Sequence, residues 1–284
     1  MLHAFSVDVE DWYQSSYDFN APITELCLRN TRIVLDFLSH YDIKGTFFVQ
    51  GMVADKYPIL VKEIDERGHE VQSHGFSHRP VNRMTPAEFR NELKETSKHL
   101  EDITGKAVTG FRAPDFTIDE NSFWAFDVMC ECGIKYDSSI FPIKTKRYGI
   151  GGFEAGYSVI KTHSGTVEEL PVSVLQLNSL KGKRIPIGGG GYIRLFPLFF
   201  LKYCLRKLDM TGNPFIIYCH PYEFNPLEWK QMLKHVPMSR RIHQGVGRQG
   251  FRKKISGLLS SGSFGTMSDV LKLISERGSE SICA

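Results

Sequence analysis

Two segments near the start of the chain carry side chains that could hold a metal ion. Carboxylates cluster in Asp8-Val9-Glu10-Asp11, at the end of an apolar run, and two imidazoles follow at His74 and His78. A hard oxygen ligand with two histidines holds Zn²⁺ or a similar divalent ion and leaves positions open for water and substrate. If the two segments meet in space, they form a metal-dependent hydrolytic site.

The spacing of the residues in the acidic segment assigns them different roles. Asp8 and Glu10 are two residues apart, so on an extended strand both face the same side. Neighbouring carboxylates repel each other unless a cation or an arginine neutralises one of them. A metal ion on one and Arg112 on the other would meet this need. For Asp8 or Asp11, capping of the next segment is the alternative.

Other reactive side chains also follow predicted strands. His220 comes directly after the apolar run 215–219 and before Pro221. A histidine titrates near neutral pH and can donate a proton to a leaving group. Barrel enzymes build their active sites at the carboxyl ends of their strands. We therefore expect five strand-end residues to converge on one mouth: Asp8, His74, Arg112, Asp137 and His220.

Short strand-like runs alternate with helical ones along the chain. Repeated strand-helix units imply a mostly parallel sheet, and their number favours a closed or nearly closed β/α barrel. Thr85 and Glu88 form a capping box with Pro86 at the first helical position. The predicted strands are 3–9, 45–49, 69–73, 108–111, 134–136, 167–175 and 215–219, and the predicted helices include 23–39, 53–67 and 121–132.

Size and composition are those of a globular α/β protein. The chain has 284 residues, of which 42% are hydrophobic and 24% charged. We find no apolar run of the ~18 residues that a membrane span needs, and no basic n-region of a signal peptide. Six cysteines lack the spacing of a disulfide framework. We expect a cytoplasmic chain, which could lie at the inner face of the membrane.

Charge is distributed unevenly. The segment 229–268 has eight Lys or Arg residues and neither Asp nor Glu. Such a segment suits an anionic lipid surface, a pyrophosphate or nucleic acid. We expect membrane or pyrophosphate contact and not nucleic acid, with a solvated basic face as the alternative. The predicted organisation is a catalytic barrel, 1–235, with a basic C-terminal extension, 236–284, packed on it.

Four segments in order resemble the motifs of the polysaccharide deacetylase family, also called carbohydrate esterase family 4 or the nodulation-factor deacetylase homology domain. The resemblance spans about residues 1–225. More narrowly, 8–12, 186–194, 220–224 and 264–267 resemble the subgroup from exopolysaccharide loci with exosortase systems, which has a C-terminal extension. The four family motifs are matched by 6–11, 74–78, 112–114 and 215–220.

The resemblance implies a distorted (β/α)7 barrel and one divalent metal ion, usually zinc. It implies that Asp8 is the general base, that Arg112 orients it and that His220 is the general acid. His74 and His78 would be metal ligands. This sequence has Val9 where the family has a second aspartate, so we predict Glu10 as the acidic ligand and Asp11 as the second choice.

The family's fourth motif has no clear match in this sequence. Asp137 and Glu169 are both candidates to orient His220. We expect substrate contacts from Trp12, Pro114, Asp115 and Tyr192.

The glycine run 188–191 could admit a sugar close to the backbone or be a plain loop. The implied activity is removal of the N-acetyl group from a sugar of a polysaccharide or of a lipid- or nucleotide-linked precursor. An amide hydrolase of the allantoinase-like type and a non-catalytic glycan-binding pseudoenzyme are the alternatives.

Overall fold

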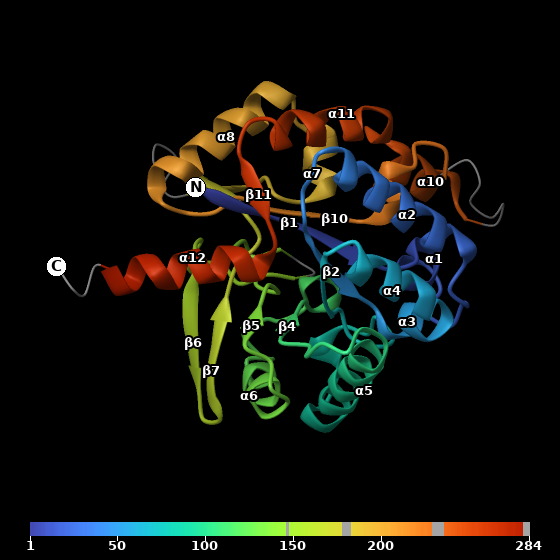
Figure 1. The fold of residues 1–284 in the computed structure, drawn as a ribbon, viewed down its shortest axis with the longest axis vertical. Helices are drawn as coiled ribbons and strands as arrows, with labels where there is room; N and C mark the ends of the chain where they lie inside the picture. The colour runs from blue at the N-terminus through green and yellow to red at the C-terminus, as the bar shows by residue number, and fades with distance from the viewer. Residues whose placement is uncertain (146–147, 178–182, 229–235, 281–284) are drawn as a thin grey trace.

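A curled, mostly parallel sheet runs through the protein and is covered by helices on its outer side (Figure 1). The computed structural model describes residues 1–145, 148–177, 183–228 and 236–280. Its strand order is β10-β1-β2-β3-β4-β5-β7-β6. The strands are β1 (Leu2–Val9), β2 (Thr46–Val49), β3 (Glu70–Ser73), β4 (Gly110–Phe111), β5 (Tyr136–Asp137), β6 (Ser158–Thr162), β7 (Gly165–Glu169), β10 (Ile216–Cys219) and β11 (Ser263–Gly265).

The predicted distorted barrel is confirmed as a curled half-barrel sheet with helices. A separate two-stranded sheet pairs β8 (Val174–Leu177) with β9 (Lys183–Pro186). Among the described residues, no helix combines the length and the apolar character that crossing a bilayer requires. The helices are α1 (Trp12–Ser16), α2 (Glu25–His40), α3 (Gly51–Lys56), α4 (Pro58–Glu66), α5 (Pro86–Thr104), α6 (Trp124–Glu131), α7 (Gly190–Leu195), α8 (Leu198–Thr211), α10 (Met238–Gly245), α11 (Arg248–Leu259) and α12 (Met267–Glu280).

Strand β1 is the centre of the sheet. It pairs in parallel with β10 along one edge, and with β2 and β11 along the other. Its apolar side chains, from Ala4 to Val9, are fully buried on both faces, which explains why the strand reads as a nearly continuous apolar run. Because β1, β3 and β10 run in the same direction, the residues that follow them lie at one edge of the sheet.

Several predicted elements differ from those observed. The predicted helix 53–67 is two helices, α3 and α4, because Pro58 begins α4 and has no N–H to continue the hydrogen bonds of α3. The predicted strand 167–175 is likewise two strands, β7 and β8, which belong to different sheets. The capping box of α5 is confirmed, with Thr85 and Glu88 each accepting from the other's backbone.

The C-terminal residues add a strand to the main sheet. In β11, Ser263 and Gly265 lie opposite Leu2 and Ala4 of β1. The division at residue 235 stays a prediction, since 229–235 fall outside the described residues, as do the predicted basic contacts Lys230 and Lys234.

Three basic residues of the C-terminal segment are used inside the protein. Arg248 is buried and donates to Glu228 at 2.9 Å. Arg252 donates to the carbonyl of Phe224 at 2.8 Å, and Lys254 donates to the carbonyl of Arg194 at 2.6 Å. These cations therefore attach α11 to the rest of the barrel.

The contact between β4 and β5 predicts one position that tolerates no larger side chain. A Cβ on Gly110 would lie 2.2 Å from the ring of Tyr136. That ring is buried, and its hydroxyl donates to Glu70 at 2.8 Å. We expect Gly110→Ala to lower the free energy of unfolding by about 1–3 kcal/mol in urea titrations.

The matched control is Gly250→Ala, in α11. A Cβ there would have no heavy atom within 4 Å. Because alanine favours a helix over glycine, this change should leave the free energy of unfolding unchanged or raise it by up to about 1 kcal/mol. Equal effects of the two substitutions would contradict the packing argument.

Candidate active site

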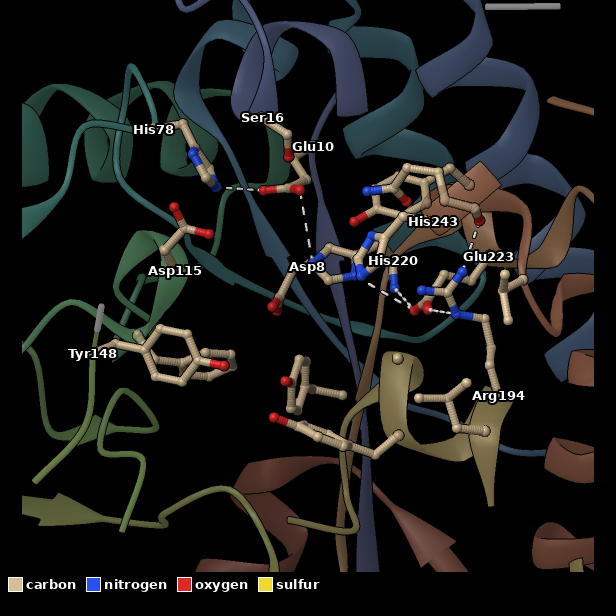
Figure 2. A pocket seen from close by; sticks show the side chains of 18 of the residues that line it. Asp8, Glu10, Ser16, His78, Asp115, Tyr148, Arg194, His220, Glu223 and His243 are labelled. Carbon is tan, nitrogen blue, oxygen red and sulfur yellow. Dashed lines mark hydrogen bonds and ion pairs between the residues drawn. The ribbon is translucent and has the colours of Figure 1, made fainter. Parts of the chain in front are cut away.

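Glu10, His74 and His78 meet at the carboxyl edge of the sheet. One ligand atom from each lies within 4.8 Å of the others, and all three side chains are buried. The Glu10 carboxylate contacts Nε2 of His78 and lies 3.6 Å from Nε2 of His74. The two segments that the sequence singled out therefore do meet, with Glu10 as the shared carboxylate. Figure 2 shows the contact between Glu10 and His78.

The hydrogen bonding of His74 fits a metal ligand. Its Nδ1 lies 2.8 Å from the carbonyl oxygen of Arg112 and must donate to it, because a carbonyl only accepts. In a neutral ring, Nε2 then presents a lone pair toward the Glu10 carboxylate. A lone pair facing a carboxylate is unfavourable unless a cation lies between them, and this arrangement is the usual one for ligating histidines.

The loop that carries the two histidines is a tight bend. Gly75 and His78 both have positive φ, 72° and 62°. Glu92 of α5 accepts from the backbone N–H of Phe76 and of Ser77, at 2.9 Å each. These bonds hold the loop so that both rings turn toward Glu10.

Asp8 is held by a buried arginine, as predicted. Arg112 donates to Asp8 at 2.7 Å and to the Ser6 hydroxyl at 2.8 Å. Its other nitrogens donate to the backbone and side chain of Ser138, and its guanidinium lies 4.2 Å from the ring centre of Phe48. Because every direction of the guanidinium is used, Asp8 is fixed in orientation.

Asp11 takes no part in the cluster. Its carboxylate accepts from the backbone N–H groups of Tyr13 and Gln14 and from Thr24. It is the N-cap of α1. The second-choice ligand is thus a structural cap in this geometry, and Asp11 as a metal ligand stays a prediction that the cluster does not support.

His220 is oriented by a residue that we did not predict. Its backbone N–H donates to the Glu223 carboxylate at 3.0 Å, and its Nδ1 lies 3.4 Å from the same oxygen. Arg194 forms an ion pair with the other oxygen of Glu223 at 3.0 Å. Burial would lower the pKa of His220, but the charges of Glu10 and Glu223 raise it to about 9.

The two predicted partners of His220 lie elsewhere. Asp137 accepts from Ser139 at 2.6 Å, and Glu169 accepts from the backbone of Ile140 at 3.0 Å. Burial raises the pKa of both carboxyls, and that of Glu169 is raised further by Asp137. They form a buried carboxyl pair, so the prediction that either orients His220 is wrong. The signal for Glu223 was its place three residues after His220, with Pro221 between them.

A cavity of about 450 Å³ opens onto these groups. Asp115 and Tyr192, two of the predicted substrate contacts, line it. The other two, Trp12 and Pro114, are buried and are not among its lining residues, so their contact with substrate stays a prediction that this cavity does not support. The cavity is lined in addition by residues that the sequence did not single out, among them Ser16, Tyr148, Arg194 and His243 (Figure 2).

The glycines of the run 188–191 are required by close contacts inside the protein. A Cβ on Gly190 would lie 1.8 Å from the Glu223 carboxylate, and one on Gly189 would lie 2.4 Å from the Tyr218 hydroxyl. Tyr218 and Glu223 both line the cavity. The glycines therefore give two cavity side chains their space, whereas the sequence suggested close approach of a sugar or a plain loop.

Two family matches cover most of the chain. Residues 22–136 match the polysaccharide deacetylase family, and residues 138–272 match a domain of unknown function, DUF3473. The resemblance to the polysaccharide deacetylase family that the motifs predicted is confirmed for residues 22–136. The exosortase-associated subgroup remains a prediction.

Curated relatives match over part of their length. A peptidoglycan-N-acetylglucosamine deacetylase of Bacillus cereus is 35% identical over 99 residues, which are 34% of this chain and 36% of that protein. A peptidoglycan deacetylase of Helicobacter pylori is 30% identical over 38% of this chain and 36% of its own. A probable 4-deoxy-4-formamido-L-arabinose-phosphoundecaprenol deformylase of Shewanella sediminis is 25% identical over 50% of this chain and 42% of its own. The chain thus spans less than half the length of these three relatives.

Solved structures share the fold along nearly the whole chain. A candidate polysaccharide deacetylase from Mycobacterium smegmatis superposes with a TM-score of 0.64 at 18% identity, covering 97% of this chain and 90% of its own. The peptidoglycan deacetylase PdaC from Bacillus subtilis gives 0.51 at 14% identity, covering 99% and 95%. At these identities the likeness shows the fold alone.

The position of the acidic ligand can be tested by metal content. We expect Glu10→Gln to lower zinc affinity roughly 10-fold or more, because it removes the charged oxygen ligand. We expect Asp11→Asn to keep its zinc and to lose stability instead, because an amide has one accepting oxygen and cannot accept from both α1 and the Thr24 N–H. Zinc titration and thermal melts of the two variants give both readouts. Retained zinc in Glu10→Gln together with loss in Asp11→Asn would reverse the assignment.

Proposed function

We propose that this protein is a metal-dependent hydrolase that removes the N-acetyl group from an N-acetylated sugar. The observation that carries the proposal is the meeting of Glu10, His74 and His78 beside an arginine-held Asp8 and a carboxylate-held His220 around one cavity. Hydrolysis of an amide needs an activated water, a base and an acid for the leaving amine, and this set provides a residue for each.

The cluster would hold one divalent cation, most suitably zinc given its two imidazoles and one carboxylate. When bound, such an ion lowers the pKa of water and polarises a carbonyl. Asp8 would accept the proton of the attacking water. Its bond to Arg112 fixes its orientation on the cavity wall, which a base requires.

His220 would donate the proton to the departing amine. Its bond to Glu223 places the other ring nitrogen, Nε2, on the cavity side, 3.7 Å from Glu10. The negative charge of Glu223 beside the ring favours its protonated form, which an acid requires. The free amino sugar and acetate are the products.

The sugar is proposed to belong to a polysaccharide or to a lipid- or nucleotide-linked precursor. Polymer deacetylases and a lipid-linked sugar deformylase are both among the relatives. In the cytoplasm, where we place the chain, linked precursors would be the available substrates. The aromatic rings of Tyr148 and Tyr192 on the cavity wall suit stacking on a sugar face.

Acetate release tests the activity. We expect the zinc-loaded protein to release acetate from at least one member of a panel of soluble N-acetylhexosamine oligomers and lipid-linked N-acetylhexosamine. Asp8→Asn should lower kcat by about 100-fold or more, because it removes the base. Asp36→Asn, an exposed acid on α2, is the matched control and should leave kcat unchanged.

Absence of acetate release across the panel, or undiminished release by Asp8→Asn, would contradict the proposal. Hydrolysis of allantoin-like amides in place of acetamido sugars would favour the allantoinase-like alternative. Metal binding without any hydrolysis would favour the glycan-binding pseudoenzyme.

The role of Glu223 predicts a pH effect. Glu223→Gln removes a negative charge that raises the pKa of His220. An acid is active only below its pKa, so the alkaline limb of the kcat profile should move to lower pH, and kcat should fall on the order of tenfold with little change in KM. Gly190→Ala, which crowds the same carboxylate, should act in the same direction.

Glu66→Gln, an exposed carboxylate of α4, is the control for Glu223→Gln. An alkaline limb that stays in place in Glu223→Gln would show that Glu223 has only a structural role.

A further inference from the structure

One helix at the mouth of the cavity presents apolar side chains to solvent. Among the residues of α10, none is buried. Met238, Ile242 and the C-cap Val246 follow one another at four-residue spacing, so they lie along one side of the helix. They are 59%, 53% and 46% exposed. An apolar stripe left open on a helix needs a partner that covers it.

The helix is attached to both sides of the cavity opening. Arg194 of the cavity wall donates to the carbonyl of Gln244 at 2.7 Å. Arg240 reaches the carbonyl of Ser16 at 3.5 Å, and its guanidinium lies 5.7 Å from the ring centre of Tyr17. Since Ser16, Gln244 and Val246 all line the cavity, the stripe stands at its entrance.

A second segment of the chain, the end of helix α7, extends this apolar surface. Leu195, at the end of α7, is 65% exposed and lines the same cavity as Val246. We define the rim as Leu195, Met238, Ile242 and Val246. The rim is therefore formed by two segments that are far apart in sequence and meet at the cavity mouth.

The charged residues of α10 and of the sequence around it are of one sign. Arg240 and Arg241 are on α10 itself, and Lys253 is exposed on the next helix, α11. The sequence contains neither Asp nor Glu from 229 to 268. A partner for this surface must offer an apolar layer that the exposed side chains can enter, together with negative charge for the arginines. An anionic bilayer surface offers both, whereas an acidic protein surface offers few apolar groups.

We propose that the rim of α7 and α10 docks on an anionic lipid surface, so that the cavity opens at the membrane. The rim residues would enter the headgroup region, with the arginines of α10 at the level of the phosphates. The proposal rests on the proposed function only for what happens inside the cavity. Binding to lipid can be measured without any turnover.

Vesicle cosedimentation tests the docking surface. We expect the full chain to bind vesicles of phosphatidylglycerol and phosphatidylcholine, and to bind pure phosphatidylcholine more weakly. Added salt should weaken the binding. The double variant Met238→Ser with Ile242→Ser should bind the anionic vesicles at least about tenfold less, because it removes two of the inserted side chains.

The matched control is Ile59→Ser with Val159→Ser, at two equally exposed apolar positions on α4 and β6. It should bind as the unmodified chain does, and thermal melts should show that both double variants fold. Asp8→Asn should also bind normally, so failure of catalysis and failure of docking are separate results.

Absence of binding to anionic vesicles, or an equal loss in the control, would overturn the proposal. Self-association that the Met238→Ser, Ile242→Ser variant abolishes, without vesicle binding, would instead assign the rim to a second copy of the chain.

Discussion

The site depends on a single buried anion. Glu10 is only 4% exposed, and its carboxylate is surrounded by the rings of His74, His78 and His220. Burial would raise its pKa, yet the charges of His78 and His220 hold that pKa well below its usual range. A buried carboxylate is stable only beside positive charge. Either protonated imidazoles or a bound cation must supply it, and the buried Glu10-His74-His78 cluster offers one ligand atom from each residue to such a cation.

The other acidic residues near the site differ in the groups that bind their carboxylates. Arg112 donates to Asp8, whereas burial and contact with Asp137 raise the pKa of the Glu169 carboxyl, and burial raises that of Asp137. Glu223 is held by Arg194, which comes from the part of the chain that matches the domain of unknown function. That part therefore contributes the orienting carboxylate, the arginine that fixes it and much of the cavity wall, in addition to the strand that carries His220.

The sequence was informative where a local rule acts alone. The period of a strand selected Glu10 over Asp11, and apolar runs located β1, β2 and β10. The sequence was less informative where contacts between distant segments determine the structure. The three-residue strand β11 has no pattern of its own and forms because it pairs with β1. Glu223 was overlooked because a more distant acid was expected, although a turn places it beside His220. Arg248 was counted with an exposed basic face but is buried against Glu228.

The central claim is that one divalent ion binds between Glu10, His74 and His78. The most direct measurement is a crystal structure of the zinc-loaded protein with anomalous scattering recorded on both sides of the zinc edge. We predict one anomalous peak bonded to a Glu10 oxygen and to the Nε2 atoms of the two histidines, at distances of about 2.0–2.2 Å. A peak bonded to Asp11 or lying away from this cluster, or the absence of a peak at saturating zinc, would contradict the account.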